Sequence, residues 1–224
     1  MPLIIPDDID HYTTAGEEIF CRFLRTVAKP DDRYIVWYSP DINDSEPDFI
    51  LYNPDVGLIV FEVKDWTIDQ IREVNPKTFK VRFGFKEESR TNPHEQARGY
   101  VHNLMECLRS DGRLVNKDGF AQGKPKIPIS HGVVFPNINS YEYKERFTHD
   151  GIIPLAKILF FDDLDPHSEL CERLTGDKAS TKNRIKTTTI LLLKMPLRRS
   201  CRSRSATTLF WLMKGRIFPT RCCR

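Results

Sequence analysis

The spacing of apolar residues along the chain predicts alternating helices and strands. Residues 15–28 carry an apolar stripe at helical spacing, and either Thr13 or Thr14 can cap this helix. A second helix is expected from Asn92-Pro93, a favourable cap and first position, up to Asp111-Gly112. Shorter apolar runs predict strands at residues 34–38, 68–74, 79–85, 129–135 and 158–161, and residues 162–174 predict a short terminal helix. This order favours an α/β sandwich in which helices flank a mixed central sheet.

The most informative segment is a predicted β-hairpin at residues 46–64. Two apolar runs flank a turn at residues 54–57, and the second run predicts a central strand buried on both faces. Glu62 and Lys64 point to the same side of that strand, because side chains alternate along it. Asp48 shares their face only if the loop has three residues or a bulge, and Gly57 suits the left-handed position of such a turn. We therefore predict that arrangement.

Charged side chains at the end of a buried strand have a specific chemistry. A carboxylate or an ammonium there costs free energy unless it is paired or bound to a metal. Two carboxylates and a lysine can hold Mg²⁺ and activate a water for attack on a phosphodiester. The alternative for Asp48, Glu62 and Lys64 is a partly buried ion pair at the edge of a sheet. The pattern indicates a nuclease site.

The charge distribution divides the chain in two. Residues 1–177 carry 21 Lys and Arg against 31 Asp and Glu, a balance of −10. Residues 178–224 carry 13 Lys and Arg and no acid, which brings the total to +3. We expect a folded domain at residues 1–177. The basic stretch at 178–224 is either a disordered nucleic-acid arm or an out-of-frame translation.

The composition and the N-terminal sequence indicate the cellular compartment. Apolar residues at 40% and charged residues at 29% are typical of a soluble globular protein. Ile4-Ile5 runs at once into Pro6-Asp7-Asp8, unlike a secretory signal, and no apolar run approaches the roughly 18 residues that cross a bilayer. The six cysteines lack paired metal-binding spacing. We expect reduced thiols, no membrane association and a cytoplasmic location.

The order of short motifs resembles one family. The pieces are Gly16-Glu17, Pro47-Asp48-Phe49, Glu62-Val63-Lys64, Asn92-Pro93-His94-Glu95-Gln96-Ala97 and Asp162-Asp163-Leu164-Asp165. They resemble the nuclease-related domain, or NERD, a branch of the restriction-endonuclease-like nucleases with the Pro-Asp…Glu-x-Lys signature. The resemblance covers roughly residues 10–175, which is far more specific than Glu-x-Lys alone. It implies a restriction-endonuclease-like α/β sandwich.

The resemblance also implies roles for individual residues. Asp48 and Glu62 would bind Mg²⁺ or Mn²⁺, and the backbone carbonyl of Val63 would be a further ligand. Lys64 would orient or deprotonate the attacking water and stabilise charge on the phosphate. Glu17 would add an acidic metal contact from the first helix, although helix-dipole compensation explains an acid there equally well.

Further candidates would contact the nucleic acid. Gln96, four residues before Tyr100, resembles the Gln-x-x-x-Tyr element of related exonuclease-type enzymes, which helps to fix the site and the nucleic acid. Tyr100 can equally be a core residue. Lys80 and Arg82 lie on the basic face of the 79–85 strand and are candidates for phosphate contacts, with a solvated face as the alternative. His94 is expected to be a solvated helix residue.

The favoured function is a metal-dependent deoxyribonuclease domain acting in DNA processing or repair. Domains of the family it resembles are often followed by helicase modules, so the expected partners are DNA and a helicase module or partner. The net charge of −10 over residues 1–177 fits a domain that relies on such a partner to bind DNA. The alternative is a non-catalytic DNA- or protein-binding module, which would have no need of Asp48, Glu62 and Lys64 together.

Overall fold

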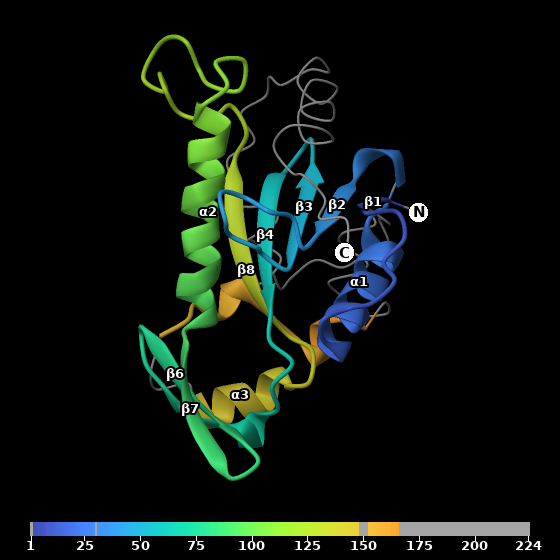
Figure 1. Cartoon of the computed structure of the whole chain (residues 1–224), viewed down its shortest axis with the longest axis vertical. Coiled ribbons are helices and arrows are strands. Elements are labelled where there is room, and N and C mark those ends of the chain that lie inside the picture. Colours follow the sequence, from blue (N-terminus) through green and yellow to red (C-terminus); the bar gives the residue numbers. More distant parts are fainter. Residues whose placement is uncertain (1, 30, 148–151, 166–224) are drawn as a thin grey trace, which may run out of the picture.

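The computed structural model describes residues 2–29, 31–147 and 152–165 (Figure 1). Six strands form one mixed sheet in the order β1-β2-β3-β4-β8-β9. Antiparallel pairs join β2 to β3 and β3 to β4, and parallel pairs join β1 to β2, β4 to β8 and β8 to β9. The strands are β1 (Leu3–Ile5), β2 (Ile35–Tyr38), β3 (Phe49–Asn53), β4 (Gly57–Val63), β8 (Ile129–Phe135) and β9 (Ile158–Phe160).

Two helices cover opposite faces of this sheet (Figure 1). In the central strand β4, Ile59, Phe61 and Val63 share a core with α1 (Ala15–Val27). Leu58 and Val60 face the other way and pack in a core with residues of α2 (Pro93–Arg109). All of β4 is buried, as its apolar run predicted. The predicted α/β class, a mixed central sheet flanked by helices, is confirmed.

Both predicted helix starts are confirmed by their caps. The Thr14 hydroxyl accepts a hydrogen bond from the Glu17 amide, and the Asn92 side chain accepts one from His94 N, with Pro93 at the first helical position. Of the apolar residues in the predicted 15–28 helix, Ile19 is 37% exposed and so lies outside the buried stripe.

A second, three-stranded antiparallel sheet lies beside the end of β4. It consists of β5 (Ile71–Val74), β6 (Thr78–Phe83) and β7 (Lys86–Thr91), in that order. Its buried face packs in a third core with β8, β9 and α3 (Ser140–Phe147). Strands at residues 68–74 and 79–85 were predicted, and the structure pairs β5 with β6, whereas β7 and α3 were not predicted.

One predicted strand is shorter than expected, and parts of other predicted segments lie outside the described residues. The predicted half-buried strand at 79–85 ends at Phe83, and Phe85 lies in the following turn, fully exposed. Only Phe161–Asp163, a 3₁₀ turn, is seen at the start of the predicted terminal helix. The rest of that helix and the basic stretch at 178–224 lie outside the described residues. Within the described part, no helix combines the length and apolar character that crossing a membrane requires.

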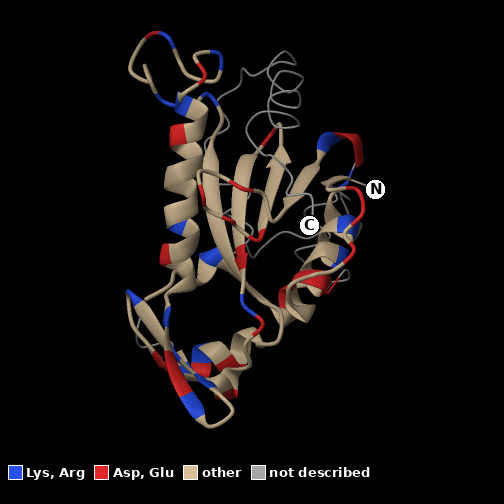
Figure 2. Cartoon of the chain, viewed as in Figure 1, with Lys and Arg blue, Asp and Glu red and all other residues tan. Residues whose placement is uncertain are grey.

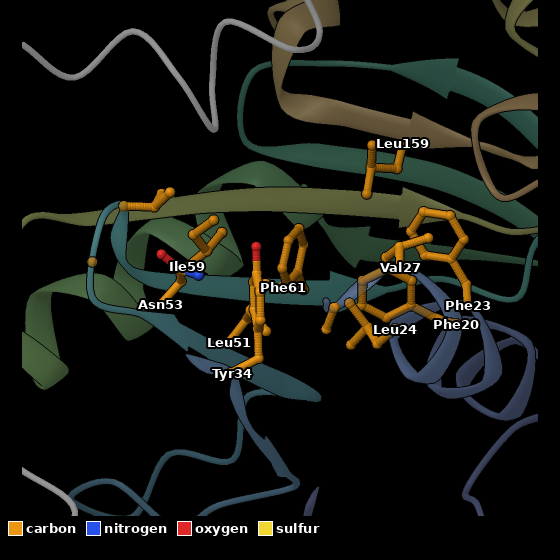
Figure 3. A pocket seen from close by; sticks show the side chains of 13 residues that line it. Phe20, Phe23, Leu24, Val27, Tyr34, Leu51, Asn53, Ile59, Phe61 and Leu159 are labelled. Carbon is orange, nitrogen blue, oxygen red and sulfur yellow. The ribbon is translucent and has the colours of Figure 1, made fainter. Parts of the chain in front are cut away.

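An almost wholly apolar pocket lies on the α1 face of the sheet (Figure 3). Phe20 and Leu24 of α1 line it together with Leu51, Ile59 and Phe61 of the sheet. Glu62 points to the opposite face, because neighbouring residues of a strand alternate. The pocket therefore takes no part in the polar site described next.

Candidate active site

The hairpin register brings the two acids of the Pro-Asp…Glu-x-Lys pattern together. β3 pairs with β4 from Phe49–Phe61 to Asn53–Gly57, so three residues form the loop, and the same register continued by one residue places Asp48 opposite Glu62. Gly57 has a φ of +103°, as predicted for this turn. The side chain of Asp48 accepts a hydrogen bond of 2.6 Å from Val63 N. The predicted common face for Asp48 and Glu62 is confirmed.

Glu62 and Lys64 form a partly enclosed ion pair. The Lys64 ammonium lies 2.5 Å from Glu62 Oε1, and the side chains of Lys64 and Glu62 are 21% and 2% exposed. Among the described residues, the other oxygen, Glu62 Oε2, is buried without a hydrogen-bond partner. Such an orphan is costly, because a buried carboxylate oxygen normally has a donor or a cation beside it.

The surroundings disfavour ionisation of both acids. Burial, followed by the charge of Glu62, raises the pKa of Asp48 to about 8, although the Val63 amide and Lys64 act in the opposite direction. Burial also raises the pKa of Glu62, against the attraction of Lys64. Two carboxylates share one ammonium here, so the site has an excess of negative charge when both are ionised.

Glu17 lies close enough to affect the same acids. Its charge contributes to raising the pKa of both Asp48 and Glu62. Its own oxygens are engaged, since Oε2 accepts hydrogen bonds from Tyr38 Oη at 2.7 Å and Thr13 N at 3.2 Å, and Oε1 accepts one from the Thr14 hydroxyl. Sequence reasoning missed Tyr38, whose apolar neighbours concealed its polar end.

Gly16 explains how α1 comes so near. A Cβ at this position would lie 2.7 Å from Pro136 Cγ and 3.1 Å from Asp65 Oδ1. Only glycine lets the first turn of the helix pack against the residues that follow β4 and β8. Gly16 therefore allows α1 to pack closely enough for the carboxylate of Glu17 to lie at this end of the sheet.

Gln96 and Tyr100 meet the site from α2. The Gln96 amide donates a 2.8 Å hydrogen bond to Tyr100 Oη. Burial raises the pKa of Tyr100, the hydrogen bond from Gln96 lowers it, and the charges of Glu62 and Asp48 raise it again, as expected for a phenol within electrostatic range of both carboxylates. Tyr100 also packs against the α2-side core, so it is both a core residue and a neighbour of the acids.

Lys80 and Arg82 lie apart from this cluster. Both are exposed on β6, in the second sheet, and Lys80 forms an ion pair of 2.6 Å with Glu73. The basic outer face of the strand is confirmed, but the structure does not bring these two residues to the carboxylates.

A histidine pair on the α2 side was also missed. His94 Nε2 lies 3.2 Å from His131 Nε2, and Lys157 Nζ lies 3.5 Å from His131 Nδ1. Burial and the nearby Lys157 lower the pKa of His131 to about 3 and lower that of His94 as well. His94 is thus a partly buried, hydrogen-bonded residue rather than a solvated one. No sequence spacing could have joined residues on α2, β8 and the segment before β9.

The acids of this cluster have the chemistry of a divalent-ion site. In the described part of the chain, no three His, Cys, Asp or Glu side chains are arranged to hold a metal. Asp48 and Glu62 nevertheless share a face, and Glu62 Oε2 has no hydrogen-bond partner within the described part of the chain. Carboxylate oxygens are the ligands that Mg²⁺ prefers, and it keeps several waters when only two carboxylates bind it. The residues present therefore fit a hydrated divalent ion.

A comparison with known protein families shows where the chain belongs. A family model described as "Nuclease-related domain" matches residues 13–136, more than half of the chain. The chain belongs to the NERD family. The NERD match contains every candidate residue from Glu17 to Tyr100. The family is nuclease-related, which makes nucleic acid the expected class of substrate.

The other two comparisons add little. No curated protein matches the chain. Among solved structures, a repair endonuclease from Pyrococcus abyssi is 13% identical with a TM-score of 0.28, over 68% of this chain and 48% of that one. The chain therefore spans about half the length of that protein, and a likeness of this size says nothing about the reaction.

Proposed function

We propose that this NERD chain is a deoxyribonuclease domain that hydrolyses phosphodiester bonds with Mg²⁺ or Mn²⁺ in DNA processing or repair. The observation that carries the proposal is Glu62 Oε2, which is buried on the face that it shares with Asp48 and has no hydrogen-bond partner in residues 2–29, 31–147 and 152–165. With Glu17 included, three carboxylates and the single ammonium of Lys64 have a formal charge of −2 when ionised. A divalent cation balances that charge.

Each residue then has a defined task. Asp48 and Glu62 hold the ion, the Val63 carbonyl is a further ligand, and Glu17 contributes from the α1 side. When bound, such an ion supplies an acidified water and charge stabilisation at the phosphate. Lys64, held by Glu62 at the more open side of the site, keeps a positive charge beside the attacking water and the developing phosphate charge.

Substrate contacts come from the α2 side and from the second sheet. Gln96 and Tyr100 form a hydrogen-bonded pair next to the acids and position the nucleic acid there. Lys80 and Arg82 contact phosphates further along the strand. Because residues 1–177 carry a net charge of −10, a helicase module or another basic partner supplies much of the DNA affinity.

The test is cleavage of labelled DNA by the full chain. Linear and circular, single- and double-stranded substrates are incubated with Mg²⁺, with Mn²⁺ or with chelator, using wild type and Lys64→Ala. Loss of the lysine should lower the rate about 10²- to 10⁴-fold while metal binding persists. Lys29→Ala is the matched control, because Lys29 forms an exposed ion pair with Asp31, remote from the site.

Each outcome is informative. Metal-dependent cleavage that is lost in Lys64→Ala and kept in Lys29→Ala supports the nuclease. Equal cleavage by all three proteins would show that the site is wrongly assigned. DNA binding without cleavage, by a chain that also fails to bind metal, would favour the alternative of a non-catalytic DNA- or protein-binding module.

A further inference from the structure

The β6–β7 hairpin has an aromatic tip on a well-anchored base. Its two strands pair from Thr78–Thr91 to Phe83–Lys86, which leaves the two-residue turn Gly84-Phe85. Gly84 has a φ of +60°, as the first position of such a turn requires. Phe79 and Val81 at the base are fully buried, whereas Phe83 is 36% exposed and Phe85 is 109% exposed. The hairpin thus presents an uncovered aromatic ring from a rigid support.

The hairpin is fixed to both sides of the candidate active site. Trp66, two residues after Lys64, lies 5.9 Å from the Lys64 ammonium and 5.9 Å from the ring of Phe79. On the other side, Asn92 donates hydrogen bonds to the carbonyls of Asn75 and Pro76, which precede β6, and caps α2. Gln96 lies one helical turn beyond that cap.

Because the hairpin base is anchored beside the candidate active site, the length of its strands determines how far the tip lies from that base. In Figure 1 the hairpin projects from one end of the molecule. The chain runs toward this same end after β4. Six residues of strand at about 3.3 Å each place the tip about 20 Å from the hairpin base. That reach corresponds to about six base steps at about 3.4 Å per step along B-DNA.

The charge of the second sheet is opposite to that of the domain. Residues 71–91 carry six Lys and Arg against three Glu, a balance of +3, whereas residues 1–177 have −10. Lys86 follows the tip directly, and the Arg90 guanidinium lies 5.5 Å over the ring of Phe83. Figure 2 shows basic and acidic residues intermixed on the hairpin. The positive balance of residues 71–91 makes this element suited to a polyanion, in contrast to the negative balance of residues 1–177 as a whole.

We propose that the β6–β7 hairpin engages DNA and that Phe85 stacks on an unpaired base. The inference rests on the proposed nuclease function, which it extends to a substrate class: DNA with a single-stranded stretch or a frayed end. An exposed ring gains most from a base whose face is uncovered, and one base on one aromatic ring contributes about 5- to 150-fold in affinity. Arg82 and Lys86 contact the flanking phosphates.

Two other occupants fit the tip less well. A protein partner would need roughly 800 Å² of surface on each side, and one ring among mixed charges does not provide a continuous apolar patch. An anionic membrane binds clusters of about four to eight Lys and Arg, whereas β7 has only Lys86 and Arg90, with Glu87 and Glu88 between them.

The experiment compares two equally exposed phenylalanines in the full chain. Phe120 is 98% exposed and has the Lys124 ammonium 5.1 Å over its ring, but it lies in the loop at the opposite end of α2. Phe85→Ala, Phe85→Trp and Phe120→Ala are titrated, in chelator to prevent cleavage, against a duplex with a single-stranded overhang and a blunt duplex. A 2-aminopurine in the overhang reports stacking through quenching.

Phe85→Ala should weaken overhang binding about 5- to 150-fold, abolish the quenching and change blunt-duplex binding less than about twofold. Phe85→Trp should retain both signals, and Phe120→Ala should match wild type. Equal effects of the two alanine variants, or none for Phe85→Ala, would overturn the proposal. A Phe85-dependent affinity for vesicles of anionic lipid, without one for DNA, would also overturn it in favour of a membrane contact.

These results separate the two proposals. Phe85-dependent binding by a chain that never cleaves DNA would reject the nuclease and keep the hairpin assignment. Lys64-dependent cleavage with unchanged binding by Phe85→Ala would do the reverse.

Discussion

Replacing Asp48 by asparagine should stabilise the metal-free domain while abolishing its activity. Asparagine has nearly the same shape, and its amide oxygen can still accept the hydrogen bond from Val63 N. It removes a carboxyl whose pKa is raised to about 8, first by burial and then by the charge of Glu62. The variant therefore no longer has the cost of ionising an acid inside the fold.

The magnitude follows from proton linkage. The ordinary pKa of the group is 3.8, so between pH 4 and about pH 8 the folded state keeps a proton that the unfolded state releases. The free energy of unfolding of the wild type then falls as pH rises through this window, by about 1.4 kcal/mol per unit at most. From pH 4 to pH 7 the upper limit is about 4 kcal/mol, and water at the partly open site reduces it to about 2–4 kcal/mol.

The assay is urea unfolding in chelator at pH 4 to 8, followed by the fluorescence of the buried Trp37 and Trp66. The stability difference between Asp48→Asn and wild type should grow by about 2–4 kcal/mol between pH 4 and pH 7. Asp55→Asn is the control, because this acid of the same hairpin is 57% exposed. Added Mg²⁺ should stabilise the wild type and not Asp48→Asn. Parallel pH profiles for wild type and Asp48→Asn would refute the burial argument.

Substitutions at Gly57 and Asn92, each with a comparison variant, test the scaffold that places the site. Gly57→Ala should lower the free energy of unfolding, measured in urea, by about 3–4 kcal/mol. The alanine would be strained by the positive φ, and its Cβ would lie only 2.2 Å from the Pro128 carbonyl oxygen. Gly84→Ala is the comparison, because Gly84 has a φ of +60° but no described atom lies within 4 Å of the new Cβ. It should lower the free energy of unfolding by only about 1–2 kcal/mol. Equal losses for the two variants would show that the clash at Gly57 is relieved by a local shift. Asn92→Ala should lose about 2–3 kcal/mol of stability, because a cap and two hydrogen bonds to the residues before β6 disappear together. Asn92→Ser keeps the cap and should fall between wild type and alanine, whereas a serine variant no better than alanine would show that the cap contributes nothing.

Local chemistry made much of the fold predictable. Thr14, Asn92 and Pro93 define helix starts through interactions within three residues, which a sequence displays directly. The buried run of β4 and the glycine after residues 54–56 define a hairpin whose loop length fixes the register. That register is enough to place Asp48 and Glu62 on one face, because it depends only on residues of the hairpin itself.

Elements that depend on distant partners were not predictable. β7 reads Lys-Glu-Glu-Ser-Arg-Thr and has no apolar alternation, so only its pairing with β6 makes it a strand. α3 is short and mostly polar, and it is held by Tyr143 and Phe147 in a core shared with β8 and β9. In both cases the stabilising contacts come from segments that a local pattern cannot include.

The sequence by itself determined the central hairpin, the helix caps and the acids and lysine of the candidate site, because alternation and turn chemistry act over a few residues. Tertiary structure alone decided what surrounds them. Tyr38 binds Glu17 from another strand, His131 meets His94 across the sheet and helix, and Glu62 Oε2 is enclosed without a partner among the residues that the structure describes. Burial, and the pKa shifts that follow from it, depend on which distant segments exclude water, so packing rather than local pattern sets the electrostatics of the site.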